Sequence, residues 1–269
     1  MMTNEAPIGV FDSGVGGLTV VREIMRQIPN ETIVYFGDTA RVPYGSKSKE
    51  TVTTYSRQIV KFLQTKNVKA VVVACNTASA FALETIKGEV DIPIIGVVKP
   101  GAKIAAETTK NGKIGIIGTE GTINSGIYNQ FLSETNPQVK VYGKACPLFV
   151  PLVEEGLLED PITIEMAKRY LGELLQYDID TLVLGCTHYP LIRHTIGRVV
   201  GDKVTLVSPA YETAKSLKEV LLNKNIESNT TQTDHRFFVS DGAEKFKAFA
   251  NTILPCEVLE TKDINIEQY

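Results

Sequence analysis

Short apolar runs, each followed by small polar residues and then by a helical stretch, recur along the whole chain. They lie at 7–12, 32–38, 70–75, 92–98, 113–119, 139–143, 181–186 and 204–208. The runs are continuous rather than alternating, and they are rich in Val and Ile, which is typical of parallel strands covered on both faces. Helical patterns at 50–66, 162–177, 211–224 and 243–252 alternate with them. The pattern predicts βαβ units and a doubly wound parallel sheet.

The runs fall into two sets that align with each other in order. Ile8-Gly9-Val10 matches Ile114-Gly115-Ile116, and Cys75 matches Cys186 at nearly the same offset. All strands of α/β proteins look somewhat alike, but a cysteine repeated after an apolar run favours duplication. We therefore expect an α/β fold of two pseudo-symmetric, doubly wound parallel-sheet domains, with the active site in the cleft between them.

The predicted boundaries make the first domain discontinuous. It comprises residues 1–98 plus 208–269, and the second domain comprises 99–207. The chain is expected to cross between them at a Pro100-Gly101 turn and to return around 204–213. The C-terminal segment is then expected to pack back on the first domain.

Composition excludes several classes of function. The net charge of −3 and the absence of basic runs or an aromatic platform argue against a nucleic-acid partner. No apolar run approaches the roughly 20 residues that span a bilayer, so no membrane segment is expected. The N-terminus has no basic stretch followed by an apolar core, so we expect no signal peptide and a cytoplasmic protein. The four cysteines lack paired spacing, which predicts free thiols and no metal site.

Cys75 and Cys186 are the candidate reactive groups. Ligands of open α/β sheets bind at the carboxyl ends of strands, and both cysteines are predicted to lie there. Each also precedes a predicted helix start, where backbone N–H groups favour an anion and lower a thiol pKa from about 8.5 toward neutrality. A single such cysteine would be interpreted as a small buried hydrophobe. The pair, in equivalent positions of two halves, predicts one shared site.

Polar neighbours of the two cysteines suit a carboxylate ligand. Asn76-Thr77 and Thr187-His188 follow them directly, although these residues could simply cap helices. Asp12-Ser13 ends the first run, and Asp12 is a candidate proton acceptor beside Cys75, with turn capping as the alternative. His188 could serve Cys186 in the same way.

Other polar residues carry weaker expectations. Tyr44-Gly45, in the loop 37–48, could place a phenol and a backbone N–H over the cleft. Asp38 and Glu154 could be further acidic groups, although a turn former and a solvated acid are the more common roles. The stretch FDSGVGGLTV departs from a dinucleotide-binding loop because Thr19 stands at the last glycine position. Cys146 and Cys256 are expected to be inert, and His194 and His235 to lie on the surface.

Four motifs in this order resemble those of the glutamate racemases, within the aspartate/glutamate racemase superfamily: IGVFDSGVGGLTV, YFGDTARVPYG, VVACNTASA and LGCTHYPL. The resemblance runs from about residue 7 to about residue 215. It implies two pseudo-symmetric α/β domains and cofactor-independent interconversion of L- and D-glutamate for peptidoglycan synthesis. The resemblance does not decide whether the protein forms a homodimer.

The same resemblance implies roles for particular residues. Cys75 and Cys186 would be the two proton donors and acceptors, Cys75 acting on D-glutamate and Cys186 on L-glutamate. The substrate-binding residues would be Asp12, Ser13, Tyr44, Gly45, Asn76, Thr77, Thr187 and His188, with Thr119 as a weaker candidate.

Three alternatives remain open from the residues themselves. The chain could racemise aspartate or another amino acid on the same scaffold. It could be a cysteine hydrolase that uses Cys186 and His188, although this would leave Cys75 unexplained. It could also be a binding module that clamps a small acid without turning it over.

Overall fold

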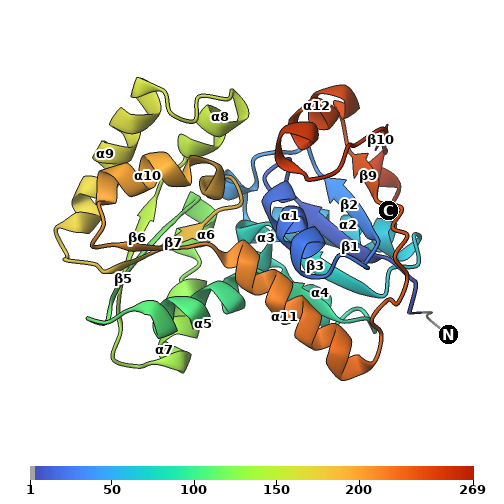
Figure 1. Ribbon diagram of the computed structural model, residues 1–269, viewed down its shortest axis with the longest axis horizontal. Coiled ribbons are helices and arrows are strands. Elements are labelled where there is room, and N and C mark those ends of the chain that lie inside the picture. Colours follow the sequence, from blue (N-terminus) through green and yellow to red (C-terminus); the bar gives the residue numbers. More distant parts are fainter. Residues whose placement is uncertain (1–3) are drawn as a thin grey trace.

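Two parallel β-sheets stand side by side in the computed structural model, which describes residues 4–269 (Figure 1). The first sheet has the order β10-β9-β2-β1-β3-β4. Its strands are β1 (Ile8–Asp12), β2 (Ile33–Gly37), β3 (Ala70–Val73), β4 (Ile94–Gly96), β9 (Arg236–Val239) and β10 (Thr261–Asp263). The second sheet has the order β6-β5-β7-β8, with β5 (Lys113–Gly118), β6 (Lys140–Ala145), β7 (Thr181–Gly185) and β8 (Thr205–Val207). We call the parts of the chain around these sheets the first half and the second half.

The second sheet repeats the order of the central strands of the first. Strands β2-β1-β3-β4 correspond to β6-β5-β7-β8, and every pairing is parallel. Cys75 follows β3 and Cys186 follows β7, so the two cysteines occupy equivalent strand ends. The predicted fold class of two parallel-sheet α/β units is confirmed.

Helices connect the strands and cover both faces of each sheet. They are α1 (Leu18–Gln27), α2 (Lys49–Gln64), α3 (Asn76–Phe81), α4 (Leu83–Lys87), α5 (Val98–Thr108), α6 (Glu120–Asn124), α7 (Ile127–Thr135), α8 (Phe149–Glu154), α9 (Pro161–Leu175), α10 (Arg193–Val200), α11 (Pro209–Lys224) and α12 (Ala243–Ile253). Three short 3-10 helices are η1 (Tyr44–Ser46), η2 (Tyr189–Ile192) and η3 (Ile266–Gln268). The four predicted helices match α2, α9, α11 and α12, each within two residues at either end.

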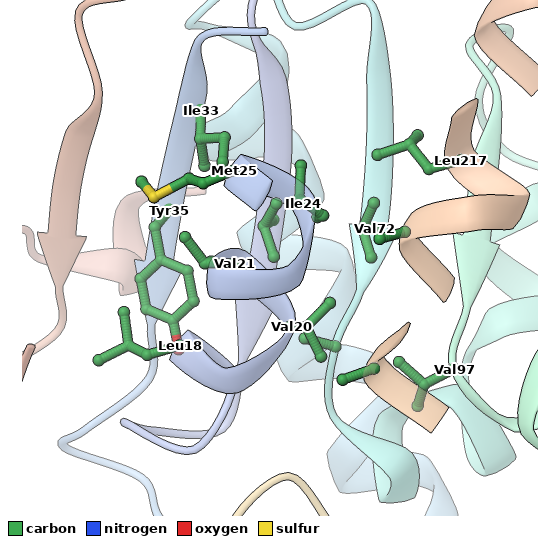
Figure 2. Packing of buried hydrophobic residues seen from close by; sticks show 14 of the residues in the cluster. Leu18, Val20, Val21, Ile24, Met25, Ile33, Tyr35, Val72, Val97 and Leu217 are labelled. Carbon is green, nitrogen blue, oxygen red and sulfur yellow. The ribbon is translucent and has the colours of Figure 1, made fainter. Parts of the chain in front are cut away.

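The central strands β1, β2, β3 and β7 are buried along their whole length, because each packs side chains on both faces of its sheet. On β1, Val10 joins the cluster beneath α1, whereas Phe11 joins the cluster beneath α2. Figure 2 shows Val20 and Ile24 of α1 lying beside Val72 of β3, all of them buried. Burying one such side chain stabilises the fold by about 1.5–3 kcal/mol.

One apolar core is shared by the two halves. The cluster that contains α1 continues through Leu217 of α11 and Ala102 of α5 to Ile116 of β5 and Val183 of β7. Figure 1 shows α5 and α11 at the lower edge of the view, on the same side of both sheets. On the opposite side, each half has a core of its own. The halves are therefore joined along one side.

Two local expectations were wrong. Pro100-Gly101 is not a turn but lies in the first turns of α5, where a proline is tolerated because its missing N–H needs no partner there. His235 is half-buried rather than on the surface, and its Nδ1 accepts a hydrogen bond from the backbone N–H of Ile33 at 3.2 Å.

The sequence patterns missed β9 and β10, which extend the first sheet beyond β2. β10 is a short, largely polar edge strand, so no apolar run marks it. Among residues 4–269, no helix has the length and apolar character needed to cross a membrane.

Candidate active site

A small cavity of about 20 Å³ has walls that come from both halves. It is lined by Ser13, Val42, Pro43, Tyr44, Gly45, Cys75, Asn76, Thr77, Thr119, Val150, Cys186, Thr187 and His188. A much larger hollow of about 590 Å³ lies near β9 and β10, but neither Cys75 nor Cys186 borders it. Of the ten residues predicted to be catalytic or to bind substrate, all but Asp12 line this cavity, and the weaker candidates Asp38 and Glu154 do not.

Cys75 lies at the end of β3 and caps α3. Its Sγ accepts a hydrogen bond from the backbone N–H of Ala78 at 3.4 Å and lies 3.8 Å from Ser13 Oγ. Only 6% of the residue is exposed. Burial and the negative charge of Asp12 raise the pKa of the Cys75 thiol to about 12, even though the hydrogen bond from Ala78 opposes the shift. The expectation of a lowered pKa at Cys75 was wrong, because burial outweighs the helix start.

Cys186 lies at the end of β7 beside a histidine. His188 Nδ1 is 3.8 Å from Cys186 Sγ, and His188 Nε2 is 3.0 Å from Oε1 of Glu154, the last residue of α8. The expected helix start directly after Cys186 was wrong, because the chain forms a turn and then η2 before α10 starts at Arg193.

Hydrogen bonds to Cys186 and Glu154 together set the charge of His188. Burial lowers the pKa of His188, but hydrogen bonds to Cys186 and Glu154 outweigh burial and raise it to about 10. The hydrogen bond from His188 lowers the pKa of Glu154 in turn. At neutral pH, an imidazolium is therefore held between the Cys186 sulfur and a carboxylate.

Asp12 is fully buried behind the cavity. Its carboxylate accepts hydrogen bonds from the backbone N–H of Gly14 at 3.1 Å and from the Thr187 hydroxyl at 3.3 Å. Burial raises the pKa of Asp12, and the positive charge of His188 opposes this. Within residues 4–269, no hydrogen bond joins Asp12 to Cys75. Asp12 therefore links the two halves through Thr187, and it acts on Cys75 only through its charge.

The glycine-rich turn after β1 allows this close approach. A Cβ on Gly16 would lie 2.4 Å from Thr187 Oγ1 and 2.5 Å from His188 Nδ1, so only a glycine fits. The hydroxyl of Thr19 donates to the Thr187 carbonyl at 3.0 Å. The residues that resembled a dinucleotide loop thus form a contact between the halves.

Asn76 and Thr77 are each tied to the second half. Asn76 Oδ1 accepts a hydrogen bond from the Tyr128 hydroxyl at 2.8 Å. The Thr77 hydroxyl lies 2.8 Å from that of Thr119, which caps α6, and 3.3 Å from that of Thr122. Sequence reasoning missed Tyr128 and Thr122, because each reads as an ordinary helical residue.

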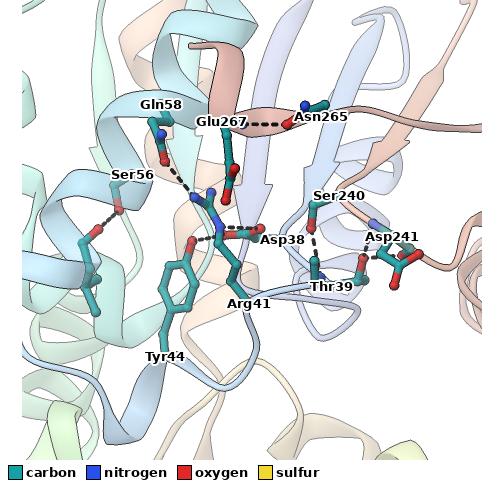
Figure 3. Close-up of polar contacts among 12 residues, drawn as sticks. Asp38, Thr39, Arg41, Tyr44, Ser56, Gln58, Ser240, Asp241, Asn265 and Glu267 are labelled. Atoms are coloured by element: carbon teal, nitrogen blue, oxygen red, sulfur yellow. Dashed lines mark hydrogen bonds and ion pairs between the residues drawn. The ribbon is translucent and has the colours of Figure 1, made fainter.

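The loop after β2 is held by a buried polar network (Figure 3). The Tyr44 hydroxyl donates to Asp38, whose two carboxylate oxygens accept from Arg41 Nε at 3.0 and 2.8 Å. Arg41 also donates to Gln58 at 2.6 Å. The Tyr44 phenol, which was expected over the cleft, thus donates its hydrogen bond to Asp38. Gly45 packs closely against Thr119, where a Cβ on residue 45 would lie 2.5 Å from the threonine Cβ.

The other cysteines lie outside the cavity. Cys146 is fully buried, Cys256 is partly exposed, and all four cysteines are free thiols, as predicted. Within residues 4–269, no three His, Cys, Asp or Glu side chains gather so as to hold a metal ion.

Comparison with known proteins gives a family match over most of the chain and relatives that match nearly all of it. The profile of the Asp/Glu/Hydantoin racemase family matches residues 8–217. A glutamate racemase of Geobacter metallireducens is 48% identical over 261 residues, which are 97% of this chain and 97% of that protein.

Solved structures agree with the sequence matches. The crystal structure of a glutamate racemase isoform from Bacillus anthracis has a TM-score of 0.94 at 43% identity, and the match covers 97% of this chain and 98% of that one. A glutamate racemase of Francisella tularensis in complex with D-glutamate has a TM-score of 0.93 at 37% identity, with coverage of 99% and 100%. The chain therefore belongs to the Asp/Glu/hydantoin racemase family and, within it, to the glutamate racemases, a group of amino-acid racemases.

Proposed function

We propose that this protein interconverts L- and D-glutamate by moving a proton at Cα between Cys75 and Cys186, without a cofactor. The observation that carries the proposal is that both cysteines, from equivalent strand ends of two similar halves, line one cavity. Glutamate is favoured as the substrate because relatives of nearly equal length are glutamate racemases, one of them solved with D-glutamate.

Two fixed groups on opposite faces of a carbon can invert it without moving. A thiolate on one side takes the Cα proton, and the pair of electrons left behind is delocalised into the α-carboxylate. The thiol on the other side then gives its proton to the opposite face. The first cysteine ends as a thiol and the second as a thiolate, so the protons balance, and the roles reverse for the other enantiomer.

The charges around the cavity favour one starting arrangement. Cys75, with a pKa of about 12, carries its proton at neutral pH and is ready to donate it. The imidazolium of His188 lies 3.8 Å from the Cys186 sulfur and can take part in proton transfer on that side. In this arrangement Cys186 accepts the Cα proton and Cys75 returns one, which agrees with the role of Cys186 toward L-glutamate that the family resemblance implies.

The acidity of Cα–H has to come from the surroundings of the α-carboxylate. Among residues 4–269, no lysine or arginine lines the cavity, and its polar side chains include hydroxyls and an amide, on Ser13, Asn76, Thr77 and Thr119. Such fixed donors stabilise developing charge, commonly by about 3–4 kcal/mol for each donor. They act more strongly when water is excluded, and a buried cavity meets this condition.

Substrate binding requires the two halves to separate. A cavity of about 20 Å³ holds roughly one water molecule and cannot contain glutamate. We propose that residues 1–98 with 208–269, and residues 99–207, move as units about the shared core at α5 and α11. We also propose, from the family resemblance, that the protein works in the cytoplasm and supplies D-glutamate for peptidoglycan synthesis.

The decisive experiment is solvent exchange. Purified protein is incubated with either enantiomer of glutamate in D2O, without added cofactor, and Cα deuteration and chirality are followed together. Deuterium should appear at Cα as the other enantiomer accumulates. Cys75→Ala and Cys186→Ala should each lower the rate by at least about a thousandfold, whereas Cys146→Ala, a change at a buried cysteine outside the cavity, should leave it nearly unchanged.

The same experiment separates the alternatives. Hydrolytic activity that survives Cys75→Ala would indicate a cysteine hydrolase that uses Cys186 and His188. Binding of glutamate without exchange would indicate a binding module. A higher rate with aspartate than with glutamate would indicate an aspartate racemase on the same scaffold.

A further inference from the structure

Tyr128 is a buried tyrosine that the proposed mechanism leaves without a role. It lies on α7 of the second half, and only 2% of it is exposed. Its hydroxyl donates to Oδ1 of Asn76 in the first half at 2.8 Å. Within residues 4–269, this is the one hydrogen bond made by the Asn76 side chain.

The same tyrosine contacts the chain beside the other cysteine. A Cβ on Gly185, the residue before Cys186, would lie 3.3 Å from Tyr128 Cε2. Asn76 is the residue directly after Cys75. One side chain therefore packs against the neighbour of each cysteine, where a small displacement would change the geometry of the cavity.

The hydrogen bond also determines which way the Asn76 amide faces. A carboxamide offers an acceptor oxygen on one side and a donor nitrogen on the other. With Oδ1 held by Tyr128, Nδ2 is left for the cavity, which Asn76 lines. A reversed amide would present its oxygen to the carboxylates of glutamate and repel them. Burial raises the pKa of Tyr128 far above its usual range, so the phenol keeps the proton that it donates to Asn76 Oδ1, whereas a phenolate could only accept.

We propose that Tyr128 is a positioning residue that fixes the Asn76 amide with its N–H groups toward a carboxylate of bound glutamate. The inference rests on the proposed function, because it assigns Asn76 a donor role in that reaction. Tyr128 itself does not line the cavity.

A double-mutant cycle tests this coupling. The kcat and KM for both enantiomers are measured for the unmodified protein, Tyr128→Phe, Asn76→Ala and the double variant. Loss of a hydrogen bond to a charged group should lower kcat/KM about 10- to 100-fold in Asn76→Ala and about 5- to 30-fold in Tyr128→Phe. In the Asn76→Ala background, Tyr128→Phe should change kcat/KM by no more than about twofold. An equal loss in both backgrounds would overturn the proposal.

Tyr189→Phe is the matched control for loss of a buried phenol. Tyr189 is also fully buried in the second half, and its hydroxyl donates to the Cys146 carbonyl at the same distance of 2.8 Å. The two variants should lose similar thermal stability, and Tyr189→Phe should keep kcat/KM within about threefold. If Tyr189→Phe lowers kcat/KM as much as Tyr128→Phe does, the loss comes from a general loosening of the packing in the second half, and the proposal fails.

Asn76→Asp keeps the proposal testable should Tyr128→Phe not fold. An aspartate still accepts the Tyr128 hydrogen bond but offers no N–H to the substrate. The KM for glutamate should rise about tenfold or more at pH 8 and recover as acid protonates Asp at position 76. An unchanged KM at pH 8 would overturn the inference. If the unmodified protein fails to racemise glutamate, the proposed function fails and the inference with it; racemisation without coupling defeats the inference alone.

Discussion

At the scale of single residues, burial and hydrogen bonds together set the protonation states of Cys75 and His188. The Cys75 thiol stands at a helix start, yet burial raises its pKa to about 12. His188 is equally buried, but its hydrogen bonds to Cys186 and Glu154 keep it charged at neutral pH. The two cysteines therefore face the cavity in unlike surroundings, although they occupy equivalent strand ends.

The raised pKa of His188 predicts a pH dependence of stability. Folding raises this pKa from its ordinary value of 6.5 to about 10, so the folded state binds the proton more tightly. The resulting stabilisation is complete below about pH 6.5 and is lost as the pH rises toward 10. Urea unfolding at about pH 6 and pH 9.5 should therefore show a larger loss of stability for the unmodified protein than for His188→Gln. His194→Gln, at an exposed histidine, serves as the control. An equal loss of stability between the two pH values in the unmodified protein and in His188→Gln would contradict the pairing of His188 with Glu154.

At the scale of elements, the site depends on short segments that meet across the boundary between the halves. The 3-10 helix η1 carries Tyr44 and Gly45 and packs on α6, and the turn after β1 packs on Thr187 and His188. A polar network that includes Asp38 and Arg41 holds Tyr44 of η1. The 3-10 helix η1 is therefore held in place by contacts within its own half.

Gly45→Ala should keep η1 from closing on α6. The added Cβ would lie 2.5 Å from the Cβ of Thr119, so one of the two segments must shift. We expect the KM for glutamate to rise about tenfold or more, at a cost in stability of about 1–3 kcal/mol, as measured by steady-state kinetics and thermal unfolding. Gly172→Ala in α9 meets no atom within 4 Å and should stabilise the helix without a change in KM. A normal KM for Gly45→Ala would show that the contact does not constrain the site.

At the scale of the whole molecule, the halves share a core on one side and enclose the cavity between them. The shared core runs through α5 and α11, whereas the site depends on hydrogen bonds and close glycine contacts. The free energy gained from apolar burial scales with the buried area, so separating the shared core would be costly. An opening motion that keeps this core and breaks only the polar contacts therefore costs less free energy.

Closure over glutamate should protect both site cysteines from alkylation. Cys75 and Cys186 are each 6% exposed, so iodoacetamide reaches them only when the halves separate. Saturating glutamate should slow their alkylation about tenfold or more, as followed by mass spectrometry of each cysteine peptide. Cys256, which is partly exposed and outside the cavity, should react at the same rate with and without glutamate. If glutamate does not change the alkylation rate of Cys75 and Cys186, closure of the two halves over the substrate is contradicted.

Much of the fold could be read from the order of apolar runs. The eight runs correspond to β1 to β8, and the repeated cysteine correctly indicated that β3 and β7 are equivalent. β9 and β10 were missed: β10 is largely polar, and the two strands are defined by their pairing, β9 with β2 and β10 with β9. The run at 92–98 was predicted too long, since its last residue begins α5.

The sequence by itself determined the parallel sheets, their repetition and the two thiols at equivalent strand ends, because these follow from local periodicity. Only the tertiary structure decided that Glu154 pairs with His188, that Tyr128 holds Asn76, and that Tyr44 turns its hydroxyl to Asp38. Two of these three contacts join residues more than 30 positions apart. Whether they form, and which protonation states burial then imposes, depends on how the elements pack, which no local pattern of residues encodes.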